Sequence, residues 1–94
     1  MNFTERIKQL REQRQLPQRK VAEALDIDSA TYCKIERGER KAKREQLSTL
    51  AKLLQTDEKE LLTLWLAEQV TAVVADEKEL SIDVLKIAKQ NLKK

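Results

Sequence analysis

The chain contains one glycine and one proline among its 94 residues, and this scarcity limits what it can fold into. β-Hairpins and long irregular loops depend on such residues for their turns. The chain is rich instead in Leu, Ala, Lys, Glu, Gln and Arg, which favour helices. A chain of this length supports one small hydrophobic core. The sequence therefore predicts a single all-α domain.

The stretch VAEALDIDSATYCKIERG interrupts a helical pattern and restarts it within a few residues. Apolar spacing predicts one helix over residues 17–25 and another over 29–37. Asp26 suits the turn because Asp tolerates left-handed backbone, and Asp28 is a good N-cap for the following helix. Gly38 would then end that helix in the left-handed conformation. Two short helices joined by so tight a turn predict a helix-turn-helix.

Apolar spacing predicts further helices on both sides of this unit. They are expected over residues 3–14, with Asn2 or Thr4 near the cap, over 44–54, from about Asp57 to Ala75, and after Leu80. Asp57 with Glu60, and Asp76 with Glu79, have the spacing of capping boxes. The helix that ends near Ala75 is apolar on more than one face, so one face needs a further partner. We divide the domain into a core, residues 1–55, and an extension, residues 56–94.

The charges are distributed unevenly along the chain. Residues 1–55 carry thirteen Lys and Arg against eight Asp and Glu, whereas residues 56–94 carry six against eight. The densest basic stretch lies between residues 34 and 44 and contains Lys34, Arg37, Arg40, Lys41, Lys43 and Arg44. Taken alone, such a run is more often a solvated face. A basic half followed by an acidic half nevertheless suggests a part that faces a polyanion.

The rarity of reactive side chains argues against several function classes. With Cys33 as the single cysteine and no histidine, the chain offers no internal disulfide, no zinc-type ligand cluster and no Cys–His or Ser–His arrangement. No apolar run approaches the roughly 18 residues of a membrane span, and no signal peptide is recognisable. We expect a cytoplasmic protein that is not an enzyme, uses no cofactor and does not contact a membrane.

A joint pattern runs from Phe3 to about Leu54 and comprises RIKQLREQRQL, Gln18, VAEALDI, Thr31 and IERGER. It resembles the lambda-repressor and Cro-like helix-turn-helix family, also called the Xre family. Two positions depart from the usual family pattern: Pro17 stands where Ser or Thr is common, and Asp26 where Gly is common. The resemblance implies a five-helix, lambda-repressor-like domain, here followed by a C-terminal helical extension.

The resemblance also implies which residues contact DNA. The helix over 29–37 would lie in the major groove of double-stranded DNA, with Ser29 and Ala30 at base edges and Thr31 and Lys34 as further candidates. Gln18 would contact a phosphate. Further phosphate or groove contacts would come from Arg37, Arg40, Lys41 and Lys43. Binding by so many cations would weaken steeply with salt.

Two other roles follow from the resemblance. Arg11 and Glu36 would form an ion pair between the first and third helices. Members of the family commonly bind paired half-sites as symmetric dimers, and the surplus apolar face of the fifth helix could form a two-fold contact. Its candidate residues are Leu62, Trp65, Leu66, Val70 and Val73. Alternatively, the sixth helix covers this face within one chain.

The sequence thus favours a sequence-specific DNA-binding transcription regulator that acts as a dimeric repressor. An antitoxin or a restriction–modification controller would have the same pattern. The alternative from a different class is a helical protein-interaction module that docks a partner through residues 56–94.

Overall fold

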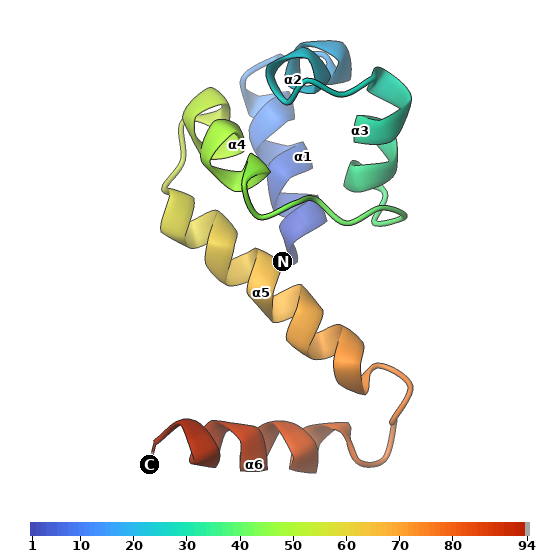
Figure 1. Ribbon diagram of the computed structural model, residues 1–94, viewed down its shortest axis with the longest axis vertical. Helices are drawn as coiled ribbons and strands as arrows, with labels where there is room; N and C mark the ends of the chain where they lie inside the picture. The colour runs from blue at the N-terminus through green and yellow to red at the C-terminus, as the bar shows by residue number, and fades with distance from the viewer. Residues whose placement is uncertain (94) are drawn as a thin grey trace.

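The computed structural model describes residues 1–93 of the chain. This part contains six helices, joined by turns and loops, and no strand (Figure 1). The helices are α1 (Phe3–Gln13), α2 (Gln18–Ala24), α3 (Ser29–Glu36), α4 (Gln46–Leu54), α5 (Glu58–Val74) and α6 (Ser81–Leu92). This confirms the all-α prediction. None of these helices is both long and apolar enough to cross a membrane.

Local sequence signals set the ends of the first helices. Asn2, one of the two expected caps, forms a capping box: its side chain accepts from the Glu5 N–H at 2.9 Å, and the Glu5 carboxylate accepts from the Asn2 N–H at 3.0 Å. The Asp28 carboxylate caps α3 by accepting from the Thr31 N–H at 2.7 Å. Asp26 (φ 58°) and Gly38 (φ 78°) are both left-handed, as predicted.

The two capping boxes predicted for the extension do not form. Asp57 caps α5 by accepting from the Lys59 N–H, while the Glu60 carboxylate binds Arg6 at 2.7 Å instead of returning to the cap. α6 starts only at Ser81, after a Leu80 cap that has no side-chain hydrogen bond, so the pattern at 76–79 lies in the preceding turn. Both pairs had the spacing of a capping box. The first does not form because Glu60 binds Arg6, and the second does not form because the helix begins after both of its residues.

The hydrophobic core lies among α1 to α4 and the first half of α5. Its most buried large side chains are Phe3, Ile7, Val21, Tyr32, Leu47, Leu50, Leu54 and Leu61. Every pair of helices with extensive contact comes from α1 to α5. We call residues 1–65 the body, because Trp65 is the last α5 side chain in this core.

The second half of α5 and α6 project from the body; we call residues 66–93 the arm. The radius of gyration is 15.0 Å, larger than the ~12 Å of a compact domain of this length. On α5, Leu66, Val70 and Val73 remain 42%, 51% and 81% exposed, and α6 contains no buried residue. The sixth helix therefore leaves these three side chains of α5 uncovered within one chain, whereas Val74, at the end of α5, is buried.

Candidate nucleic-acid interface

A tight turn joins α2 to α3 and fixes their crossing. The left-handed Asp26 reverses the chain, and the Ile27 N–H then donates to the Ala22 carbonyl at 3.0 Å. Leu25 is buried and Ile27 is packed against the core, so both sides of the turn are anchored. The predicted helix-turn-helix geometry is thus present, with Asp in the position where left-handed backbone is required.

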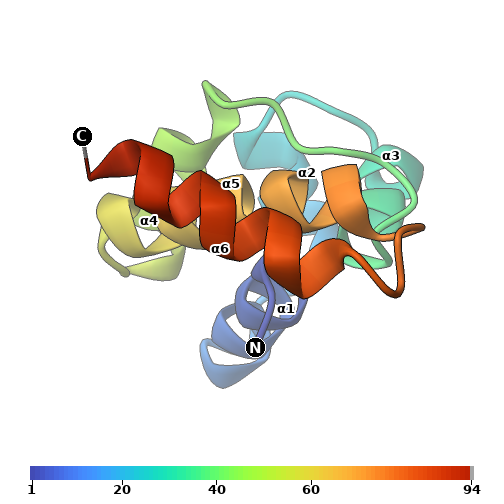
Figure 2. The same ribbon diagram turned by 90° about the horizontal axis from the view of Figure 1, so that it is seen from below.

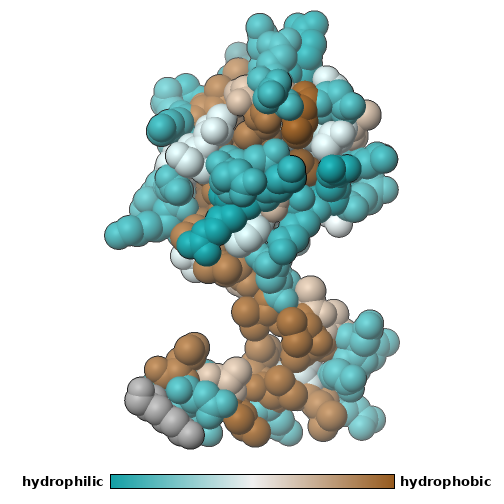
Figure 3. Space-filling model, viewed as in Figure 1, coloured by the Kyte–Doolittle hydropathy of each residue, from teal (hydrophilic) through white to brown (hydrophobic). Residues whose placement is uncertain are grey.

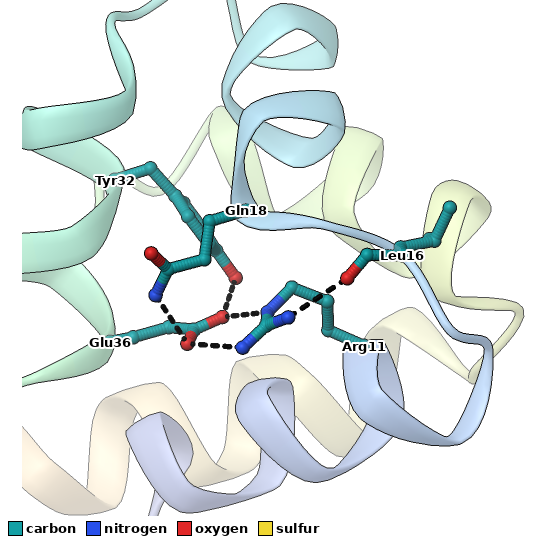
Figure 4. A network of polar contacts seen from close by, with 5 residues as sticks. All are labelled: Arg11, Leu16, Gln18, Tyr32 and Glu36. Atoms are coloured by element: carbon teal, nitrogen blue, oxygen red, sulfur yellow. Dashed lines mark hydrogen bonds and ion pairs between the residues drawn. The ribbon is translucent and has the colours of Figure 1, made fainter.

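Beneath α3 lies a polar network centred on Glu36 (Figure 4). Arg11 donates to both Glu36 oxygens, from Nε at 2.7 Å and from Nη2 at 3.1 Å, and its third bond goes to the Leu16 carbonyl at 2.8 Å. The Tyr32 hydroxyl and the Gln18 amide also donate to Glu36. The expected Arg11–Glu36 ion pair is present, and it joins α1, the start of α2 and α3.

The same bonds keep Glu36 ionised. Burial by itself would raise the pKa of Glu36, but hydrogen bonds from Arg11, Tyr32 and Gln18 outweigh it and hold this pKa below its usual range. Burial, together with the bond to Glu36, raises the pKa of Tyr32 far above its ordinary value, so the phenol stays protonated and donates. A buried carboxylate with this many donors is fully paired and holds α3 in one position.

The opposite face of α3 is open to solvent. Ser29, Ala30 and Lys34 are exposed and Thr31 is partly exposed, while Tyr32 points into the core. The first turn thus presents a hydroxyl and a methyl group, and the next turn an ammonium group. The structure brings the four predicted readout residues to one helix, and their contacts with bases stay a prediction.

The side chain of Gln18 points toward the Glu36 network and is not free in solvent, as a residue waiting for a phosphate would be. Its side-chain nitrogen donates to Glu36 at 3.0 Å, and the residue is only partly exposed. That nitrogen retains a second hydrogen, so a phosphate contact stays a prediction. No sequence pattern indicated that Gln18 also supports the Glu36 network.

A basic loop, residues 39–43, folds back beside the end of α3. The Lys34 carbonyl accepts from the Glu39 N–H at 2.9 Å, which turns the loop at Gly38. On its surface Arg37 pairs with Glu39 at 2.8 Å, so the Arg37 charge is partly balanced. Arg40 and Lys43 are exposed, and the loop is therefore a cationic surface continuous with α3.

Trp65 attaches this loop to α5. Its indole N–H donates to the Ala42 carbonyl at 2.8 Å, and the Lys41 ammonium lies 5.1 Å from the centre of its ring. Trp65 is only 8% exposed, which corrects the expectation that it lies on a dimer surface. The sequence signal that was missed is Ala42, a small apolar residue that is buried within a run of charges.

The other residues expected at a dimer surface differ in how exposed they are to solvent. Leu62 is partly buried against the core, whereas Leu66, Val70 and Val73 are exposed on the arm. The structure thus leaves three of the five candidates open for a partner.

A family model described as a helix-turn-helix domain matches residues 2–64 of the chain. The match covers the Glu36 network, α3 and the basic loop, and it ends next to Trp65. No curated protein and no solved structure matches the chain.

Proposed function

The chain belongs to the helix-turn-helix domain family, which binds DNA, and from this premise we propose that it is a transcription regulator of the lambda-repressor-like, or Xre, type. The observation that carries the proposal is the two-sided nature of α3. Its inner side is fixed by the fully paired Glu36, and its outer side exposes Ser29, Ala30 and Lys34. A helix held this firmly can present side chains to base edges with little loss of conformational freedom on binding.

In the proposed complex, α3 enters the major groove with its N-terminal end toward the bases. Ser29 can hydrogen-bond several base edges, Ala30 can contact a thymine methyl group, and Lys34 favours guanine acceptors. Arg40 and Lys43 in the basic loop then contact phosphates, which positions the domain without reading sequence. Such contacts make the observed affinity fall with rising salt.

One helix-turn-helix reads few base pairs, so we further propose that the protein binds as a symmetric dimer. Its two α3 helices would occupy half-sites separated by about 34–36 Å, one turn of DNA. The apolar arm supports this proposal because it lies outside the body and leaves α3 uncovered. Occupying a promoter in this way would repress transcription without any cofactor.

The test is selection of bound sequences from a random duplex pool, followed by affinity measurements on the enriched site. A palindrome with two short half-sites is expected. The double variant Ser29→Ala with Lys34→Ala should lose more affinity for that site than for random DNA. A matched control, Thr63→Ala with Lys59→Ala, removes a hydroxyl and an ammonium from exposed positions on α5 and should leave both affinities unchanged. Equal losses on both kinds of DNA would contradict base readout by α3.

A second candidate is a protein-interaction module, and the exposed apolar arm is the observation that favours it. In that case the helical body is a scaffold and the arm docks a different protein, such as a toxin or a modification enzyme. Affinity for random DNA measured across salt concentrations distinguishes the two. A steep decrease with salt supports the regulator, and a flat response supports the interaction module.

A further inference from the structure

α6 packs only weakly on its own chain: it contains no buried residue, and Leu85 is its only large apolar side chain that is partly covered. Four of its large apolar residues are exposed, and so is the cap residue Leu80: Leu80 56%, Ile82 61%, Val84 42%, Ile87 59% and Leu92 86%. Seen from below, it crosses the view in front of the other helices (Figure 2). An isolated helix of 12 residues is only marginally stable in water. Its apolar side therefore indicates that something covers it.

The exposed apolar surface is large enough for a stable interface. Hydrophobic surface gathers on the lower half of α5 and on α6, below a largely hydrophilic body (Figure 3). Leu66, Val70 and Val73 of α5 add to the five exposed side chains of Leu80 and α6. Together the eight expose an area on the order of the ~800 Å² that each partner buries in a standard interface. Any partner has to be apolar over a matching length.

The charges along the arm identify that partner. Residues 76–83 carry four carboxylates and one lysine, a net charge of −3, whereas residues 84–93 carry three lysines, a net charge of +3. A second copy in antiparallel orientation places the acidic end of each arm beside the basic end of the other. A parallel copy would place like charges together at both ends. Two-fold symmetry allows the antiparallel arrangement because both copies then use the same surface.

We infer that the arm is a self-docking element in which α6 pairs antiparallel with α6 of a second copy of this chain. Val84 and Ile87 lie near the middle of the helix, and the two-fold axis passes close to them. The charges at the two ends set the orientation. The inference rests on the proposed dimer, and it adds which helix forms the seam and in which direction.

The first experiment reverses the charges at one end of the arm. One variant carries Glu77→Lys, Glu79→Lys and Asp83→Lys, and the other carries Lys86→Glu, Lys89→Glu and Lys93→Glu. Each alone should dimerise at least about tenfold more weakly than the parent chain, because both ends then repel. An equimolar mixture should recover the parent's affinity as a heterodimer. Sedimentation without DNA measures both, with circular dichroism to check that α6 stays helical.

The second experiment fixes the orientation with a chain that carries all six reversals. Antiparallel pairing predicts that this chain dimerises with itself but not with the parent chain, which native mass spectrometry detects. Preferential heterodimers with the parent would show parallel pairing and overturn the inference. So would half-reversed variants that dimerise as well as the parent, or a parent chain that stays monomeric. None of these outcomes depends on DNA, so they are separate from failure of α3 to read a sequence.

Discussion

The body and the arm are both helical, but they differ in how their apolar side chains are packed: most of those of the body are buried against one another, and most of those of the arm are exposed. In the body even a charged side chain is buried and paired, as Glu36 is by Arg11, Tyr32 and Gln18. In the arm, Leu66 and Val73 face solvent, and α6 has no buried residue. The body buries most of its apolar side chains within one chain, and the Glu36 network keeps α3 in one position. The arm has a surface that only association completes, so the two regions should respond differently to the same kind of change.

The largest expected effect comes from the centre of the body. Glu36→Ala leaves the Arg11 guanidinium, whose side chain is only 12% exposed, without its carboxylate. Breaking one side of a buried ion pair typically lowers the free energy of unfolding by about 3–5 kcal/mol. Urea unfolding measures this loss. Glu77→Ala in the exposed turn before α6 is the matched control and should change stability by less than ~0.5 kcal/mol. Equal effects of the two would contradict the division into body and arm.

Part of the same stabilisation should depend on pH. The pKa of Glu36 is lower in the folded chain than in the unfolded chain, because burial, which opposes ionisation, is outweighed by three donors. Its contribution is therefore complete above the ordinary Glu value of about 4.3 and is lost as the pH falls below it. Unfolding free energies at pH 5.5 and pH 3 should differ more for the parent chain than for Glu36→Gln. Identical pH profiles would show that Glu36 is not the group responsible.

The helix-turn-helix could be predicted from the sequence because its signals are local. Asp26 and Gly38 occupy left-handed positions and Asp28 caps α3, and each of these depends only on neighbouring residues. The Arg11–Glu36 pair is a long-range contact. Its prediction rested on the family resemblance, because periodicity does not show which residues of distant helices meet. The all-α fold follows from composition and apolar spacing.

The contacts that place the basic loop could not be predicted in this way. α5 is apolar around most of its circumference, so spacing alone does not show whether Trp65 or Leu66 faces the core. The answer depends on the Ala42 carbonyl, which comes from a segment without regular structure. The capping box expected at Asp76 did not form for a related reason, because no packing against the body reinforces this weak pattern.

A smaller effect should appear where body and arm meet. Trp65→Phe keeps an aromatic ring in the core and beneath Lys41 but removes the donor to the Ala42 carbonyl. Losing this buried bond should cost about 1–3 kcal/mol of unfolding free energy. The loop that carries Arg40 should become more mobile, so the salt dependence of DNA binding should become shallower. Lys41→Gln is the control that removes the charge over the ring while leaving the indole bond. A Trp65→Phe chain with unchanged stability and salt dependence would show that this bond does not position the loop.

The smallest effect is expected in the arm when the chain is dilute. Val73 is 81% exposed, so Val73→Ala should change the unfolding free energy of the monomer by less than ~0.5 kcal/mol. At concentrations where the parent chain dimerises, the variant should unfold at a lower temperature, because association stabilises the folded state by mass action. Thermal unfolding across a wide range of protein concentrations separates the two regimes. The equally apolar Val21, which is fully buried, is the contrasting position: Val21→Ala should lower stability by a similar amount at every concentration. A concentration-independent loss for Val73→Ala would mean that the arm stabilises the single chain and does not serve association.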